Sequence, residues 1–542
     1  MTTSKRTFKL SSKLTRGFSF GLVGMTALGG LWFSSMPSAM AATAAPPAAG
    51  TATPKAPKPT ATPKRDKAAW RKEADALFEN KDYRGAVNAY TQAIKLGDKT
   101  DGAYAGRGEA YIKLGQNSLA VEDLDMAIEA NDSDPHYFVL RGRAYGKLGE
   151  RDKAFEDFDA ALALDSEYAA AYIERGDVFY DADEYDEAIE NYNKALEINP
   201  ESATAYNNRG NAYSGKGDEN KAIEDYTKSL ELKSDDAVTL ANRCWSHRIL
   251  GDYEQAQVDC DQAVEADDRE YFAFESRARL YYAQDLYEDA LNDLNSAIEL
   301  QSEQPALYNL RGNVHFSLDA YESAIEDYTS AIEYGPDNAV YYDNRGDTYN
   351  QMGEYDKAIA DLDQAIELDG EYGLAYRHRG KAYLNQENYD AALADLDKAI
   401  ELDGEDYDNY IGRGDVYFDQ EDYQAAIDDY GKAIEIDADN STGWAYRGSA
   451  YYQNDKYDNA LKDLTKAIQL SPEWAYAYNQ RGNVYYSKKD YKRSIADYTK
   501  AIEFRPDFGL YYYNRSDAYK AAGQKAKAQA DLEKSQALGY EP

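Results

Sequence analysis

The sequence predicts an all-α fold, an α-solenoid built from antiparallel helix pairs. An Arg recurs every 34 residues, without insertion or deletion, thirteen times from Arg107 to Arg515. Each copy also contains two apolar stripes of helical period separated by a turn. A single helix pair cannot bury its own apolar face, whereas stacked copies can, so the repeat predicts a solenoid.

Residues 1–41 have the order of a secretory signal peptide. Basic residues precede an apolar run from Phe18 to Phe33, and small residues lead to a cleavage site after Ala41. The run is shorter than the roughly 20 residues that a spanning helix needs. We expect export to the periplasm or the cell exterior, with no stable membrane insertion after cleavage. An uncleaved anchor is the alternative.

Residues 42–66 are mainly Ala, Pro, Thr and Lys, a composition that predicts a disordered linker. Residues 67–542 hold fourteen copies of the 34-residue unit. The first, opened by Trp70, has diverged. In the last copy, polar residues replace the apolar Ile495 and Ile502 of the copy before it: Gln529 and Gln536. We interpret this copy as a polar cap.

The copy that starts at residue 203 illustrates the helix pair. Four residues at spacing i, i+3, i+4 and i+7 share one face of a first helix: Tyr206, Arg209, Gly210 and Tyr213. A turn is expected near Gly217, and a second apolar stripe runs from Ala222 to Leu230. Pro200 marks the exit of the preceding copy, where a helix must stop.

These positions carry a family signature of aromatic, Gly, Tyr, Ala, aromatic, Ala and Pro, met here by Tyr206, Gly210, Tyr213, Ala188, Tyr192, Ala195 and Pro200. Over residues 67–542 the chain resembles the tetratricopeptide-repeat proteins. The resemblance implies a right-handed superhelix, with extended partner segments bound in its concave groove. An Arg stands just before the Gly, where the family more often has Leu.

Two columns of the repeat predict how its helices meet. Gly or another small residue follows the Arg in every copy, which indicates a close approach between helices. Sixteen residues after the Arg stands an Asp in twelve copies and Asn191 in the other. We interpret the column as a ladder of paired side chains that fixes register. The alternative is an Arg stripe that binds an anionic ligand.

Composition restricts the function. The chain has 98 acidic and 60 basic residues, a net charge of -38, which disfavours nucleic acid and favours a basic partner. We find no catalytic motif, no cofactor motif and no His, Cys or acidic residues at the spacing of metal ligands. We therefore expect a protein that is not an enzyme and has no cofactor or metal.

The remaining candidate site is the face of the first helix opposite the packing stripe, at positions five and two before the Arg and two and five after it. Aromatic rings and Asn amides on or beside this face suit contacts with a protein or peptide. The candidates are Trp245, Arg248, Phe272, Arg279, Tyr282, Phe316, Asn207, Asn208, Asn211 and Asn313. The alternative is that the rings pack on adjacent helices.

The copy from 237 to 270 departs most from the others. It contains both Cys residues, Cys244 in the small column and Cys260 on the second helix. Because the predicted hairpin pairs Arg243 with Asp259, it also brings the two Cys together, and export permits a disulfide. The alternative is two reduced Cys that act as small core groups.

The sequence thus favours a non-enzymatic scaffold or adaptor outside the cytoplasm that binds extended partner segments in its groove. The alternative is an acidic structural or divalent-cation-buffering protein of the envelope. In that case the acidic surface, and not the groove, carries the function.

Overall fold

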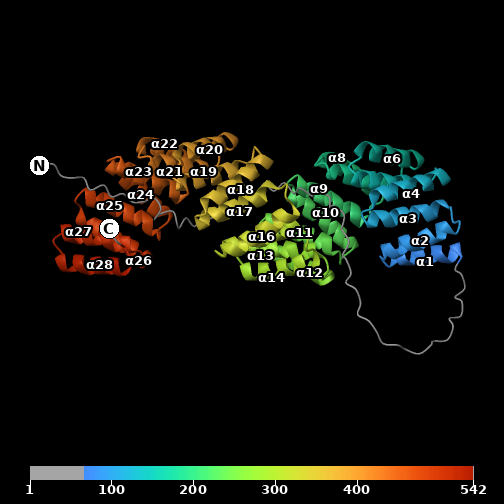
Figure 1. The fold of residues 1–542 in the computed structure, drawn as a ribbon, viewed down its shortest axis with the longest axis horizontal. Helices are drawn as coiled ribbons and strands as arrows, with labels where there is room; N and C mark the ends of the chain where they lie inside the picture. Colours follow the sequence, from blue (N-terminus) through green and yellow to red (C-terminus); the bar gives the residue numbers. More distant parts are fainter. Residues whose placement is uncertain (1–65, 541–542) are drawn as a thin grey trace, which may run out of the picture. The chain divides into compact units, whose positions relative to one another are not determined.

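The computed structural model describes residues 66–540, and within that range it contains helices and no strand. The helices follow one another as packed antiparallel pairs (Figure 1), which confirms the predicted all-α array. The predicted signal peptide, 1–41, lies outside the described residues. So does the predicted linker, 42–66, apart from its last residue.

The described residues divide into two compact units, 66–302 and 303–540. The first unit contains α1 (Lys67–Glu79), α2 (Tyr83–Lys95), α3 (Asp101–Lys113), α4 (Asn117–Ala130), α5 (Pro135–Lys147), α6 (Arg151–Leu164), α7 (Ala169–Tyr180), α8 (Tyr185–Ile198), α9 (Ala203–Gly215), α10 (Glu219–Leu232), α11 (Ala237–Ile249), α12 (Tyr253–Ala266), α13 (Tyr271–Ala283) and α14 (Tyr287–Leu300). The second unit contains α15 (Pro305–Ser317), α16 (Tyr321–Tyr334), α17 (Ala339–Met352), α18 (Tyr355–Leu368), α19 (Gly373–Asn385), α20 (Tyr389–Leu402), α21 (Tyr407–Asp419), α22 (Tyr423–Ile436), α23 (Ser441–Gln453), α24 (Tyr457–Leu470), α25 (Ala475–Ser487), α26 (Tyr491–Phe504), α27 (Gly509–Ala521) and α28 (Lys525–Ala537).

The turn inside each described pair contains a residue in the left-handed conformation, and in some pairs a side-chain cap follows it. In the pair α9–α10, Gly217 adopts a left-handed conformation with φ 77°, at the predicted turn. The next residue, Asp218, caps α10, because its carboxylate accepts a hydrogen bond from the backbone N–H of Lys221. A left-handed residue at the end of the first helix and a capped start of the second helix together reverse the chain.

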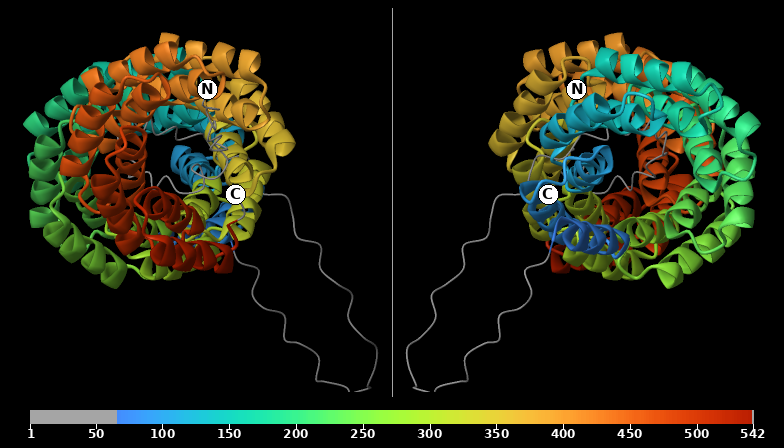
Figure 2. Two further views of the ribbon diagram at one scale, coloured as in Figure 1. Left: turned by 90° about the vertical axis from the view of Figure 1, so that its left-hand side faces the viewer. Right: turned by 90° about the vertical axis from the view of Figure 1, so that its right-hand side faces the viewer.

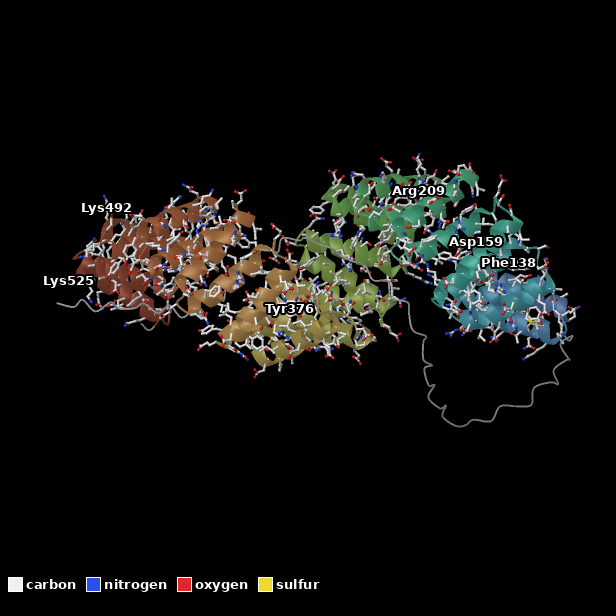
Figure 3. The ribbon with its side chains drawn as sticks, turned by 90° about the horizontal axis from the view of Figure 1, so that it is seen from above. Phe138, Asp159, Arg209, Tyr376, Lys492 and Lys525 are labelled. Atoms are coloured by element: carbon white, nitrogen blue, oxygen red, sulfur yellow. A yellow bond between two sulfur atoms is a disulfide. The ribbon has the colours of Figure 1, made fainter. Side chains whose placement is uncertain are left out.

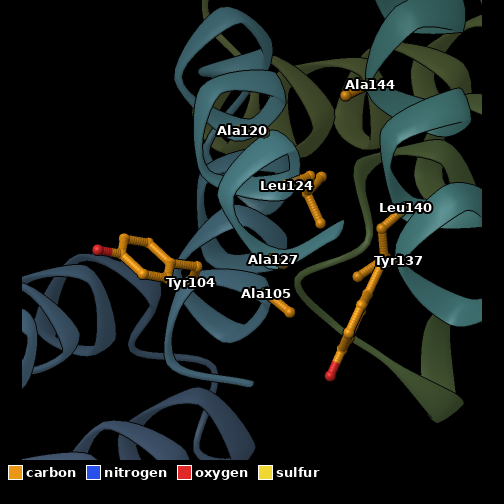
Figure 4. Packing of buried hydrophobic residues seen from close by; sticks show 8 residues of the cluster. All are labelled: Tyr104, Ala105, Ala120, Leu124, Ala127, Tyr137, Leu140 and Ala144. Atoms are coloured by element: carbon orange, nitrogen blue, oxygen red, sulfur yellow. The ribbon is translucent and has the colours of Figure 1, made fainter. Parts of the chain in front are cut away.

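Small residues allow the pairs to stack closely. Around α3, α4 and α5, Leu124 is fully buried against Ala105 and Ala144, and Tyr137 and Leu140 of the next pair close the cluster (Figure 4). Such clusters repeat along each unit. The core is therefore a continuous layer between helices and not one central cluster.

The predicted close approach at the Gly column occurs against a ring of the partner helix. A Cβ added at Gly210 would lie 2.6 Å from Cε1 of Tyr226, which is 2% exposed. At Gly346, where Leu362 replaces the Tyr, the added Cβ would lie 2.8 Å from Leu362 Cγ. Gly is needed here because a buried side chain of the second helix occupies the space a Cβ would need.

The recurring Arg pairs with the partner sixteen residues on, as predicted. Arg209 donates from Nε and Nη2 to both carboxylate oxygens of Asp225, at 2.7 and 2.6 Å. The Arg of every later and earlier copy from Arg107 onward makes the equivalent contact, with Asn191 accepting from Arg175. These guanidinium edges are occupied within the chain, which favours the register ladder over a ligand stripe.

The same Arg also reaches the preceding pair, a contact that the sequence reasoning missed. Arg209 donates from Nη1 to Asn193 on α8, at 2.6 Å. Arg175 likewise donates to Asp159, at 2.8 Å, and Figure 3 labels Asp159 and Arg209 among the side chains. Each such Arg therefore joins three helices, and the ladder holds consecutive repeats together as well as the two helices of one repeat.

No helix in residues 66–540 is long and apolar enough to cross a membrane. In α28, Gln529 and Gln536 are exposed, in line with the polar face expected for the last copy.

We predict that Gly210→Ala destabilises the pair α9–α10. Overpacking against Tyr226 costs about 1–3 kcal/mol, which exceeds the gain of at most about 1 kcal/mol in helix propensity. The matched control is Gly431→Ala within α22, where the nearest atom, Arg447 Nη1, lies 3.6 Å from the added Cβ. There the propensity gain should stabilise the helix. Local hydrogen exchange measures both, and equal effects at the two sites would contradict the steric account.

Candidate partner-binding groove

Within each unit the first helices of the pairs line the inner side of a curve. Most odd-numbered helices contact the next odd-numbered helix, whereas no even-numbered helix in residues 66–540 makes a comparable contact with the next even one. Elements on the inside of a bend lie closer together. The end-on views of Figure 2 show each unit as a curved double layer of helices. The candidate residues lie on the first helices of the pairs, which form the inner layer.

Buried Tyr hydroxyls hold several of the groove amides in place. Tyr226 of α10 donates to Asn211 Oδ1 of α9, at 2.8 Å, and Tyr328 of α16 donates to Asn313 Oδ1 of α15, at the same distance. Tyr192 and Tyr430 make the equivalent bond to Asp177 and Asp415. One side of each groove amide is thus used internally. The Nδ2 hydrogens of Asn211 have no acceptor in residues 66–540, so they face the groove as donors.

Asn207 and Asn208 are engaged more fully. Asn207 Oδ1 accepts from Thr239 and Asn242 of α11, both at 3.1 Å, and its Nδ2 donates to Asn208. Asn208 in turn donates to Asp177 of α7, at 2.8 Å. These two amides link neighbouring first helices. Fewer of their hydrogen-bonding groups remain for a partner than the sequence alone suggested.

Asp177 lies in a network that perturbs its ionisation. Burial, with Glu174 one turn before it, raises the pKa of the Asp177 carboxyl to about 7, against the bonds from Tyr192 and Asn208. Glu174 is ion-paired with Arg143 of α5 and accepts from its Nε at 2.8 Å. Near neutral pH the Asp177 carboxyl therefore exchanges between its neutral and charged forms.

Two aromatic candidates pack against their own hairpin. The Phe316 ring centre lies 5.6 Å from that of Tyr321, and the Tyr282 ring centre lies 5.9 Å from that of Tyr287. Phe272 packs against the buried cluster of Leu230 and Leu240. For these three rings the structure supports the packing interpretation. Phe316 and Asn313 also belong to the second unit and are not grouped with the others.

Trp245, Arg248 and Arg279 are brought together, on α11 and α13. The Cζ atom of Arg248 lies 4.4 Å from the Trp245 ring centre, and that of Arg279 lies 5.4 Å from it. Arg279 also pairs with the buried Glu275, at 2.7 Å. We call Trp245, Arg248 and Arg279 the Trp245 patch, a basic and aromatic surface on an acidic chain.

Cys244 and Cys260 form a disulfide between α11 and α12, with their Cα atoms 5.4 Å apart. Both residues are fully buried, beside Ala256 and Leu280. The bond fastens the helix pair directly beneath the Trp245 patch.

His378 is the centre of a polar network in residues 66–540, and that part of the chain contains no metal cluster. His378 of α19 lies 2.9 Å, by its Nδ1, from Asp343 of α17, which also accepts from Tyr372. Burial lowers the pKa of His378 and the nearby carboxylates raise it, with a net rise. No group of three His, Cys, Asp or Glu side chains there is arranged to hold a metal ion. Partners 35 residues apart were not identifiable from the 34-residue pattern alone.

Comparison with protein families gives consistent matches along the array. A profile described as "TPR repeat" matches residues 176–217, 278–319, 312–353, 346–387, 414–455 and 448–488. Profiles described as "Tetratricopeptide repeat" match residues 203–236, 373–406 and 475–508, residues 71–135, and residues 135–168 and 510–538. The search of curated proteins gives no match.

Solved structures with the same kind of array include three that differ in length. A chain of the APC/C hetero-tetramer Cut9–Hcn1 is 14% identical with a TM-score of 0.51, and the match covers 87% of this chain and 94% of that one. A tetratricopeptide-repeat protein from Parabacteroides merdae is 20% identical (TM-score 0.39; 49% and 98% covered). YrrB, described as a TPR protein with an unusual peptide-binding site, is 26% identical (TM-score 0.29; 34% and 96% covered). The first likeness shows a shared fold.

We predict that the disulfide forms in the native protein and stabilises the pair α11–α12. Replacing both Cys244 and Cys260 by Ala should lower the stability of this pair by about 3 kcal/mol, because the unfolded loop is then unconstrained. Thiol counting on unfolded, unreduced protein should detect no free thiol, and reduction should release both. Two free thiols before reduction would refute the prediction.

We predict that Asp177→Asn stabilises the first unit above pH 7. The folded pKa of about 7 exceeds the ordinary value of 3.8, so the fold binds the proton more tightly than the unfolded chain does. Stability is therefore lost as pH rises from about 4 to about 7. Asn removes this loss and still accepts from Tyr192, as Asn211 does from Tyr226.

Urea unfolding of wild type and variant across this pH range tests it. The stability difference should be largest at pH 8 and should shrink toward pH 4. Glu190→Gln, at an exposed site on α8, is the control and should give no such trend. A difference between Asp177→Asn and wild type that is independent of pH would contradict the assignment.

Proposed function

The chain belongs to the tetratricopeptide-repeat family, and on that premise we propose that it is a non-enzymatic protein–protein interaction scaffold. It works outside the cytoplasm and binds an extended segment of a partner protein in the concave groove. The observation that carries the proposal is the Trp245 patch, because a Trp flanked by two guanidiniums on a concave face is a surface suited to protein contacts.

The polar groups of the groove support an extended occupant. An amide donor such as Asn211 can bond to the backbone of an extended segment, and Asn stands at the same position in two further, non-adjacent copies, as Asn313 and Asn483. Tyr226 and its equivalents fix these amides beforehand. Fixing them in the free protein reduces the ordering that binding requires.

Two features support a location outside the cytoplasm. Residues 1–41 have the organisation of a secretory signal peptide. The paired Cys244 and Cys260 suit an oxidising compartment. The net charge of -38 favours a partner that is basic overall and disfavours nucleic acid.

The test is capture of a partner from envelope extract of the source organism by the immobilised chain from residue 42 onward. We expect saturable capture of a defined protein at an ionic strength of about 0.15 M. Trp245→Ala should weaken capture about tenfold, because a buried aromatic anchor is lost. The control, Trp444→Ala, removes a Trp that stacks on Arg447 and donates to Ala438, and it should leave capture unchanged.

The opposite outcome favours the acidic structural or cation-buffering role. Capture that disappears with added salt, together with many weak Ca²⁺ sites by calorimetry, would assign the function to the acidic surface. Equal capture by the Trp245→Ala variant would remove the patch from the proposal.

A further inference from the structure

Arg248, the last groove residue of α11, is a cation with no carboxylate bonded to it, although Glu219 lies near enough to raise its pKa. Within residues 66–540 it makes no hydrogen bond and no ion pair, and its Nε is buried without an acceptor. Burial and the neighbouring Arg279 lower the pKa of Arg248 to about 10. The ladder Arg residues show the opposite arrangement, since each has an Asp or Asn side chain on its Nε.

The groups around Arg248 do not supply the missing acceptor. The carboxylate of Glu219 accepts from Ser214 and Ser246, at 3.0 and 2.5 Å. The carboxylate of Glu275 is bound by Arg279. Trp245 holds the guanidinium by its face and leaves the N–H edges unpaired.

An unpaired guanidinium with a buried Nε destabilises the fold that holds it. A carboxylate can accept two parallel hydrogen bonds from such a fork, which is the strongest pairing open to Arg. The site therefore has the properties of a binding site that a ligand completes. In the free protein the unpaired guanidinium lowers the stability of the fold.

The helix pair around Arg248 is also specialised within the array. Along this part of the chain the family matches run up to residue 236 and resume at 278, on either side of α11 and α12. In this pair Trp245 replaces the polar residues found at the same position of most copies, and α11 contacts α13 along more of its length than other neighbouring first helices do. This contact brings Arg279 to the Trp245 ring.

We propose that Arg248 is the docking point for one Asp or Glu side chain in the middle of the partner segment. The inference rests on the proposed groove function. Groove positions continue on both sides, with Asn211 on α9 and Arg279 on α13, so the segment runs past the site and does not end there. Because the chain carries a net charge of -38, the rest of the segment is neutral or basic, and the single carboxylate sets its register.

The test uses random peptides with blocked ends, selected on the full chain from residue 42 onward. We expect the selected peptides to contain one acidic residue at a fixed position among neutral and basic residues. Replacing that residue by its amide should weaken binding about tenfold or more. Arg248→Gln should abolish the preference and make the acidic and amide peptides bind equally.

The matched control is Arg143→Gln, which removes a groove Arg whose fork is already occupied by Glu174. It should leave the acidic preference intact. Arg248→Gln should melt at the same temperature as wild type or higher, which separates loss of binding from loss of fold.

Three results would overturn the proposal. Selected peptides without an acidic preference, or a preference that survives Arg248→Gln, would refute the Arg248 site and leave the groove function standing. If no peptide binds, the proposed function fails with it.

Discussion

The structure depends on the guanidinium of one Arg per repeat. Its Nε edge pairs with an Asp or Asn of the same helix pair, and in most copies its Nη1 atom reaches the second helix of the pair before. These directional bonds join three helices, so they fix the register within the hairpin and the register between consecutive repeats. Apolar stacking alone would fix neither register, because it has no preferred direction. The groove positions lie two and five residues from this Arg, so the same contact sets where they face.

Much of this architecture could be predicted because the same residues recur at the same positions of each repeat. The Gly column, the Arg–Asp spacing of sixteen and the turn at Gly217 are contacts within one hairpin, where sequence distance determines spatial distance. Contacts between hairpins were missed. The contact of Arg209 with Asn193 involves a position that varies among Thr, Asp, Asn and Gly, and the contact of His378 with Asp343 occurs once. A single sequence gives no repeated signal for such contacts.

The sequence located the groove positions by their register, but it did not show which of their side chains are engaged within the chain. Every copy with Tyr at the position of Tyr226 carries Asn or Asp at the position of Asn211, although Asp347 and Asp517 occur in copies with Leu there. That pairing was present in the sequence and would have shown that these amides are held from behind. By contrast, nothing in the sequence distinguished Phe272, which packs on the cluster of Leu230 and Leu240, from Trp245, which packs against Arg248, because both positions are aromatic on the same helix face.

The disulfide has a mechanical consequence for a protein whose repeats contact only their neighbours. Such an array unravels pair by pair when an end is pulled or frays. The bond between Cys244 and Cys260 closes one hairpin covalently, so an unravelling front that arrives from either side cannot extend the chain between them. Under tension the pair α11–α12 would resist extension, and Trp245 and Arg248, which lie between the two Cys, would be among the last residues to be pulled apart.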